Sequence, residues 1–255
     1  MIQHRIPEAL AAMSARAFLQ KYTGVSLNLW RKIKQSESFR LNGVLVNPAL
    51  TEVHPGDVIS YELIEHSRLE PMALPLDIRY EDDALLIVNK PAGQLVHPSQ
   101  KGHTATLANA VLFYYKETQQ PWSFHPVHRL DRQTSGLVLI AKQPQMQHLL
   151  STKNGQLFHR SYLALIEGRL TPPAGQIDAP IARKPGSIIE RMVSPAGSPA
   201  LTYYRTITPD ERYSLLELTL ATGRTHQIRV HLASLGHPPL GADLYVGTQE
   251  RNAHT

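Results

Sequence analysis

The segment 128–142 reads HRLDRQTSGLVLIAK and combines a charged turn with an almost wholly apolar run. The run Leu137–Ala141 has the length and composition of a strand that is buried inside a sheet. The turn before it holds Asp131 between Arg129 and Arg132. The sequence therefore predicts a carboxylate at the edge of a buried sheet, on a loop of the kind that carries functional groups.

Asp131 also has a purely structural interpretation. Aspartate is common in turns because its side chain accepts hydrogen bonds from nearby backbone amides. A surface ion pair with Arg132 would then contribute little to stability. Residue types alone do not separate this interpretation from a catalytic one.

Further strands and helices are predicted on either side of this segment. In the run Tyr213–Ala221, leucines alternate with other residues, as in a strand that is buried on one face. Helical patterns cover 104–116 and 225–235. The predicted fold class is α+β, with a mixed, mostly antiparallel central sheet and flanking helices. The predicted strands are Ala84–Asn89, Leu137–Ala141, Tyr162–Ile166, Leu201–Ile207 and Tyr213–Ala221.

The first 66 residues follow a different pattern. Ser14 and Ser26 each precede apolar residues at helical spacing, so each is expected to cap a short helix. Asn42-Gly43 is a strong signal for a two-residue hairpin turn. A Pro-Gly-Asp turn and the predicted strand Val58–Ile64 follow. We expect a small α/β module over 1–66, a proline-containing linker over 67–75 and a larger domain over 76–255.

The charge of the chain favours a polyanionic partner. Its 26 Lys and Arg residues exceed the 21 Asp and Glu residues, which gives a net charge of +5. The segment 142–191 contains seven cations, Lys142 among them, and three acids. A solvated surface explains such a stretch, but Arg183-Lys184-Pro-Gly also reads as a basic hairpin tip suited to a phosphate backbone.

Several classes of chemistry lack the residues that they require. The chain has no cysteine, which excludes disulfides, thiolate catalysis and cysteine-ligated metal sites. Its 13 histidines include no His-Glu-x-x-His pattern, and nucleotide-binding glycine motifs are missing from the sequence. No window approaches 18 apolar residues. We therefore expect a cytoplasmic protein, monomeric by default, without metal, cofactor, secretory signal or membrane span.

A second polar constellation, GRTHQIRVH, covers residues 223–231. Thr225 is expected to cap a helix whose apolar stripe is formed by Ile228, Leu232 and Leu235. An arginine on this helix, Arg229, can hold a carboxylate in a paired geometry and keep it ionised. A plain surface arginine is the alternative.

Three motifs, taken in order, resemble the pseudouridine synthases of the RluA type. They are YEDDALLIVNKPAG at 80–93, HRLDRQTSG at 128–136 and GRTHQIRVH at 223–231. The resemblance covers about residues 76–245. It implies that a uridine in ribosomal or transfer RNA is isomerised: the base leaves its ribose, turns, and is rejoined through a carbon–carbon bond, without a cofactor.

The resemblance also implies roles for individual residues. Asp131 corresponds to the essential aspartate, which attacks the electron-poor ribose carbon, stabilises it or takes a neighbouring proton. Arg229 corresponds to the partner that keeps this carboxylate charged and oriented. Tyr162 matches the tyrosine that stacks on the target base, although by residue type alone it would pack in the core. Arg129 is expected to occupy the space that the flipped uridine leaves.

Residues 14–64 are similar to a small RNA-binding module shared by a small-subunit ribosomal protein, some tRNA synthetases and several RNA-modifying enzymes. This similarity implies that cations of the second helix and the hairpin contact RNA phosphates, which positions the RNA without reading its sequence. A solvated helix face would explain the same charges without any ligand. The cations are Arg31, Lys32, Lys34 and Arg40.

Two other functional classes are alternatives to this assignment. A non-catalytic RNA-binding protein on the same fold would not need Asp131, Tyr162 and Arg229 together. A glycosidase would need a second carboxylate across the scissile bond.

The chain departs from the family pattern at two places. The family often has a lysine where Arg160-Ser161 precedes Tyr162. It also usually continues beyond Tyr245 through an Arg-x-x-Leu-His segment into further strands.

Overall fold

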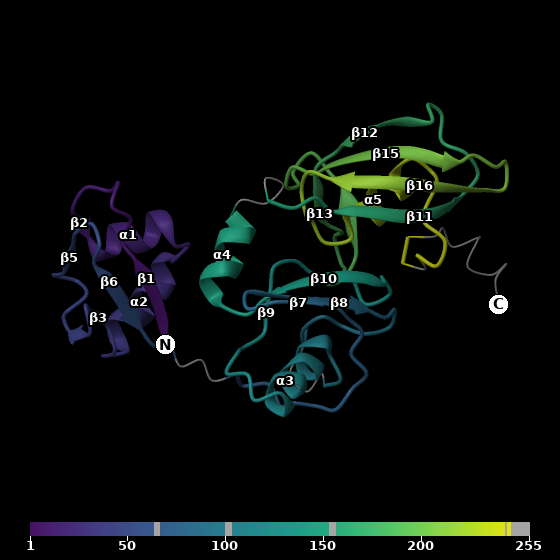
Figure 1. Ribbon diagram of the computed structural model, residues 1–255. Coiled ribbons are helices and arrows are strands. Elements are labelled where there is room, and N and C mark those ends of the chain that lie inside the picture. Colours follow the sequence, from purple (N-terminus) through teal and green to yellow (C-terminus); the bar gives the residue numbers. More distant parts are fainter. Residues whose placement is uncertain (64–66, 100–103, 153–156, 243, 246–255) are drawn as a thin grey trace. The chain divides into compact units, whose positions relative to one another are not determined.

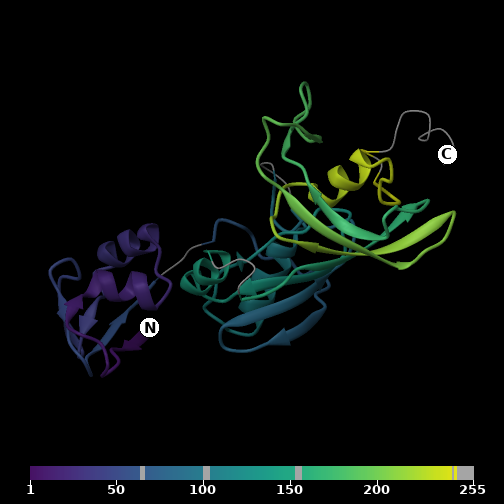
Figure 2. The same ribbon diagram turned by 90° about the horizontal axis from the view of Figure 1, so that it is seen from above.

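The computed structural model describes residues 1–63, 67–99, 104–152, 157–242 and 244–245 (Figures 1 and 2). The chain divides into two compact units, Met1–Asn154 and Gly155–Thr255. This division falls inside the predicted domain 76–255. The limits of that domain, of the module 1–66 and of the linker 67–75 therefore stay predictions.

Two short helices near the N-terminus, α1 (Ala15–Tyr22) and α2 (Leu27–Gln35), begin where the sequence predicted. The hydroxyl oxygen of Ser14 accepts a hydrogen bond from a backbone amide of α1 at 3.2 Å, and that of Ser26 accepts one from α2 at 3.1 Å. Each serine satisfies an amide that has no partner within the first helical turn. Both predicted caps are confirmed.

The predicted Asn42-Gly43 hairpin is also present. Both residues have positive φ, 50° and 83°, as a type I′ turn requires. The Asn42 amide donates to an Asp57 carboxylate oxygen at 2.7 Å and its oxygen accepts from the backbone amide of Val58 at 2.8 Å. The hairpin is therefore tied to the Pro-Gly-Asp turn that precedes the next strand.

The strands of this part form a small sheet in the order β1-β6-β3-β4, and β2 pairs separately with β5 (Figure 1). Buried residues from 6 to 61 form a hydrophobic core of their own, which is what an independently folding module needs. β6 ends at Tyr61, and Ile64, the predicted end of this strand, lies outside the described residues. The strand bounds are β1 Ile2–Arg5, β2 Met13–Ser14, β3 Arg40–Leu41, β4 Val44–Leu45, β5 Glu52–Val53 and β6 Val58–Tyr61.

A second antiparallel sheet follows, in the order β7-β8-β10-β9. Its two central strands pair along six residues each, and their inward side chains, such as Val88 and Val138, are fully buried. α3 is capped by Thr106, whose hydroxyl and backbone amide both bond the Asn109 side chain. The bounds are β7 Ile78–Glu81, β8 Leu85–Lys90, α3 Leu107–Glu117, β9 His125–Pro126, β10 Gly136–Ala141 and α4 Pro144–Thr152.

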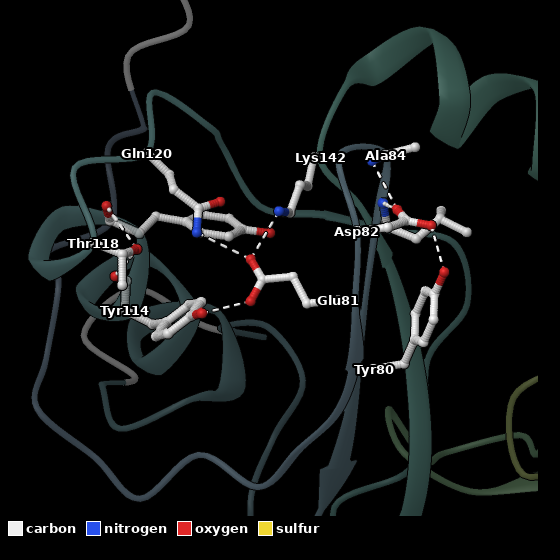
Figure 3. A network of polar contacts seen from close by, with 10 residues as sticks. Tyr80, Glu81, Asp82, Ala84, Tyr114, Thr118, Gln120 and Lys142 are labelled. Carbon is white, nitrogen blue, oxygen red and sulfur yellow. Dashed lines mark hydrogen bonds and ion pairs between the residues drawn. The ribbon is translucent and has the colours of Figure 1, made fainter.

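Figure 3 shows the polar contacts that fix α3 and the following loop to this sheet. The Glu81 carboxylate accepts from Lys142 Nζ at 2.7 Å, from Gln120 Nε2 at 3.0 Å and from the Tyr114 hydroxyl. Burial opposes ionisation of Glu81, but these bonds outweigh it and hold the pKa of this carboxyl below its usual value. Lys142 is only 6% exposed. A solvated surface therefore does not account for this member of the cation-rich stretch 142–191.

The second unit contains a third antiparallel sheet, in the order β11-β16-β15-β12, and the helix α5. Leu216, Leu218 and Ser214 are buried on one face of β16, as the leucine alternation predicted. A short hairpin of β13 and β14 packs with Val230 of α5. The bounds are β11 Ser161–Glu167, β12 Ala174–Asp178, β13 Ile181–Arg183, β14 Arg191–Val193, β15 Leu201–Thr208, β16 Tyr213–Leu220 and α5 Gln227–Ser234.

The α+β class with mostly antiparallel strands is confirmed, and the described strands of the larger predicted domain are divided between two four-stranded sheets and the two-stranded hairpin β13–β14. Two details of α5 were predicted wrongly. Its N-cap residue is His226, in a left-handed conformation (φ 58°), and not Thr225. Leu235 is 44% exposed instead of completing the apolar stripe, because the helix has already ended at Ser234.

Candidate active site

Asp131 lies on a turn between β9 and β10, as predicted. Its backbone carbonyl accepts from the amide of Thr134 at 3.1 Å, and Leu130 beside it is buried. On the N-terminal side of Asp131, the Nε2 of His128 accepts a hydrogen bond from the backbone amide of Leu139 in β10 at 3.2 Å. The turn that carries Asp131 is therefore anchored by the buried side chain of Leu130 and by the hydrogen bond between His128 and the central strand β10.

A neighbouring loop, residues 91–94, is joined to this turn by two hydrogen bonds between Gly93 and Arg132, one of them from the Arg132 side chain. The Gly93 amide donates to the carbonyl of Arg132 at 2.8 Å, and the Arg132 Nε donates to the carbonyl of Gly93 at 2.9 Å. Gly93 has a φ of 86°, a conformation that side chains rarely adopt. The Asp131 turn is thus paired with the KPAG segment of the first motif.

Lys90 lies beneath both loops and is fully buried. Its Nζ donates to the carbonyls of Pro91 (2.7 Å), Gln94 (2.8 Å) and Arg132 (3.3 Å). Burial lowers the pKa of Lys90 to about 8, and attraction to the Asp131 carboxylate opposes that shift. Lys90 is a positioning residue that sequence reasoning missed; the signal was a lysine at the end of a buried strand, where a surface cation is not expected.

Replacing Lys90 with methionine is expected to lower the free energy of unfolding by about 2–4 kcal/mol, because the carbonyls of Pro91 and Gln94 lose the donor that this fully buried ammonium supplies. Chemical denaturation measures this loss. Lys116→Met, at an exposed position of α3, serves as the control and should change stability by less than about 0.5 kcal/mol. Equal stability of the Lys90 variant and wild type would show that the ammonium does not hold the two loops.

Tyr162 and Arg229 lie in the second unit, whereas Asp131 and Arg129 lie in the first. Tyr162, on β11, is partly buried and packs on the same hydrophobic cluster as Ile228 of α5. Arg229 follows Ile228 on that helix. The structure therefore brings the tyrosine to the helix that carries the arginine. Their assembly with Asp131 is part of the proposal made below.

A chain of buried hydrogen bonds fixes α5. His231 Nε2 must carry a proton, because its partner at 2.9 Å is the carbonyl of Ala179. Nδ1 then accepts from the Thr202 hydroxyl at 2.9 Å, which in turn accepts from Gln227 Nε2 at 3.0 Å. Burial lowers the pKa of His231, which favours the neutral ring. These residues, which the sequence did not single out as supports, orient the helix that bears Arg229.

The predicted RNA-binding cations lie at exposed positions of α2, of β3, of the β13–β14 hairpin and of the turn that carries Asp131. Some bond their own backbone or a neighbour: Arg40 donates to the carbonyl of Gly43 at 3.2 Å, and Arg31 donates to Asn28 at 3.3 Å. Arg129 is exposed beside Asp131. The other cations that were predicted to bind RNA are also exposed. They are Lys32 and Lys34 of α2, and Arg183 and Lys184 at the β13–β14 hairpin.

In the part of the chain that the structure describes, no group of three or more His, Asp or Glu side chains is arranged to hold a metal ion. No helix in the same residues is long and apolar enough to span a bilayer.

Comparisons with known proteins agree with the three motifs. The family model described as RNA pseudouridylate synthase matches residues 84–234. The ribosomal large subunit pseudouridine synthase D of Haemophilus ducreyi is 36% identical over 97% of this chain and 74% of its own length. A Bacillus subtilis protein named uncharacterized RNA pseudouridine synthase YhcT is 40% identical over 85% of this chain and 71% of its own length.

Solved structures show the same fold. Human RNA Pseudouridylate Synthase Domain Containing 4 aligns with a TM-score of 0.56 and 25% identity, over 68% of this chain and 69% of its own. Human RNA Pseudouridylate Synthase Domain Containing 1 aligns with a TM-score of 0.59 and 24% identity, over 73% and 76%. With the family match over more than half of the residues, these findings establish that the chain belongs to the RNA pseudouridylate synthase family and is an RNA-isomerising enzyme.

Proposed function

We propose that the chain converts uridines of large-subunit ribosomal RNA to pseudouridine. The observation that carries this choice of RNA is the similarity, over nearly the whole chain, to relatives named ribosomal large subunit pseudouridine synthase D. Transfer RNA is the alternative substrate. The absence of cysteine fits a reducing compartment, and we place the enzyme in the cytoplasm as a monomer.

The reaction breaks the N1–C1′ bond of uridine and forms a C5–C1′ bond. The proton at C5 is lost and N1 gains one, so atoms and charge balance without an oxidant or a co-substrate. In this proposal the Asp131 carboxylate acts at the ribose, where positive charge develops as the base leaves. An ionised carboxylate can attack C1′, stabilise the cationic carbon or accept a neighbouring proton.

The other site residues support this step. Arg229 pairs with Asp131, which keeps the carboxylate charged and oriented. Tyr162 stacks on the detached base and assists removal of the C5 proton. Arg129 fills the space that the flipped uridine vacates and so offsets part of the cost of unstacking.

Positively charged groups outside this site bind the RNA backbone. Their contacts with phosphates set the position of the RNA and make affinity depend on salt. The N-terminal residues 1–66 act as a separate RNA-binding module in this proposal. The groups are Arg31, Lys32, Lys34 and Arg40 of the module and Arg183 and Lys184 of the β13–β14 hairpin.

Release of tritium from RNA labelled at C5 of uridine tests the choice of substrate. Total ribosomal RNA and total transfer RNA, each from cells that lack this enzyme, are incubated separately with the full chain. We expect stoichiometric release from ribosomal RNA and at least about 10-fold slower release from transfer RNA, the scale of a 1.4 kcal/mol preference. The reverse order would assign the enzyme to transfer RNA.

A further inference from the structure

Two adjacent isoleucines are exposed at the tip of the β13–β14 hairpin. Ile188 is 75% exposed and Ile189 is 54% exposed. Scattered surface leucines and isoleucines are common, but two consecutive ones at a projecting turn form a continuous apolar tip. No role in the proposed reaction accounts for them.

The tip is held in a fixed conformation by its own polar groups. The Ser187 hydroxyl oxygen accepts from the backbone amides of Glu190 (3.0 Å) and Ile189 (3.3 Å). The Arg191 guanidinium donates to the carbonyls of Ile189 and Glu190, both at 3.0 Å. Lys184 pairs with Glu190 at 3.1 Å across the turn. The two apolar side chains are therefore presented on a braced turn, which lowers the entropic cost of using them in binding.

The base of the hairpin is joined to the helix of the candidate site. Ile181 of β13 and Val193 of β14 pack with Val230 of α5, next to Arg229. The tip, residues 184–190, directly joins these two strands. The hairpin that carries the two isoleucines is therefore fixed to the helix that carries Arg229.

We propose that Ile188 and Ile189 form an apolar wedge that enters the base stack of the RNA near the target uridine and keeps neighbouring bases unstacked. Isoleucine is one of the side chains that proteins insert between stacked bases. The cations Arg183 and Lys184 beside the tip favour a polyanion over an apolar protein surface as the occupant. The wedge rests on the proposed function, and acts where an RNA helix must open before its uridine can be flipped.

The test compares two substrates that carry the same uridine. One is a folded ribosomal RNA transcript labelled with tritium at C5, and the other is a short single-stranded oligonucleotide around the mapped target. For the double variant Ile188→Ser/Ile189→Ser we expect kcat/KM to fall about 10-fold on the folded RNA and less than about 2-fold on the oligonucleotide, because only the folded RNA has to be unstacked. A 2-aminopurine beside the target should also fluoresce less on binding the variant than on binding wild type.

Two controls separate the wedge from other effects. Ile207→Ser removes an isoleucine that is 45% exposed at the end of β15. This variant should keep the wild-type kcat/KM on both substrates. Lys32→Ala/Lys34→Ala should weaken binding of both substrates in proportion and reduce the salt dependence of affinity by about two units of slope. Equal activity of the isoleucine double variant and wild type on folded RNA, or an equal loss on both substrates, would overturn the wedge. Failure of wild type to release tritium would instead overturn the proposed choice of RNA.

Discussion

Replacing Asp131 with asparagine is expected to lower turnover by at least about 10⁴-fold, because the variant loses the only group that the proposal places at the ribose carbon. The amide keeps the shape of the side chain but carries no charge and is a poor nucleophile and a poor base. The backbone hydrogen bond from Thr134 to the carbonyl of residue 131 is unaffected by the change. Tritium release under single-turnover conditions measures the loss.

Folding and RNA affinity should survive this substitution. We expect Kd for RNA to change less than about 3-fold, since a single carboxylate on a turn contributes little to binding a polyanion. The matched control is Asp83→Asn, an exposed aspartate in the turn between β7 and β8, which should keep full turnover. Wild-type turnover by the Asp131 variant would show that the reaction depends on another group.

Replacing Arg229 with alanine is expected to lower kcat by about 10²–10³-fold while KM changes less than about 3-fold, because the pair with Asp131 serves orientation and charge in the transition state. Alanine is a strong helix former, so α5 itself should persist. Arg229→Lys should recover part of kcat, since an ammonium supplies the charge but not the two-point geometry of a guanidinium. Steady-state kinetics with the labelled RNA separate kcat from KM.

Arg169→Ala is the control for a general loss of positive charge. Arg169 is about half exposed and pairs with the exposed Glu211 at 3.7 Å, so its removal should leave kcat unchanged. A loss confined to KM in the Arg229 variant would contradict the proposed pairing and place Arg229 among the phosphate contacts instead.

Elements with local signals were the ones that the sequence predicted well. The serine caps of α1 and α2 and the Asn42-Gly43 turn each depend on residues within a few positions of one another. The alternation in β16 worked because one face of that strand is buried along its length. Where the stabilising partner is a neighbour in sequence, the pattern contains most of the physical information.

Elements with weak patterns were missed. α4 (Pro144–Thr152) buries only Gln145 and Leu150, so it shows little apolar periodicity, although proline at the first helical position is a start signal. Thr225 does not cap α5, because the helix begins one residue later, at Gln227, whose side chain donates to the carbonyl of Leu201 and to the Thr202 hydroxyl, both at 3.0 Å. These partners lie 25 and 26 positions away in the chain, so the sequence around Thr225 does not reveal them.

The sequence alone indicated the family, because three motifs in order resemble those of the RluA-type pseudouridine synthases. It also marked Asp131, Tyr162 and Arg229 as the residues to test. Only the tertiary structure decided that Lys90, Lys142 and His231 are buried supports and not surface or metal-binding groups. Their partners in hydrogen bonds and ion pairs are backbone carbonyls, a carboxylate and a hydroxyl. These groups lie between 1 and 61 positions away in the chain. Which residues are buried and which partners they bond depends on how the strands pair. Paired strands bring together residues that are far apart in the sequence, and no periodic pattern in the sequence marks such residues.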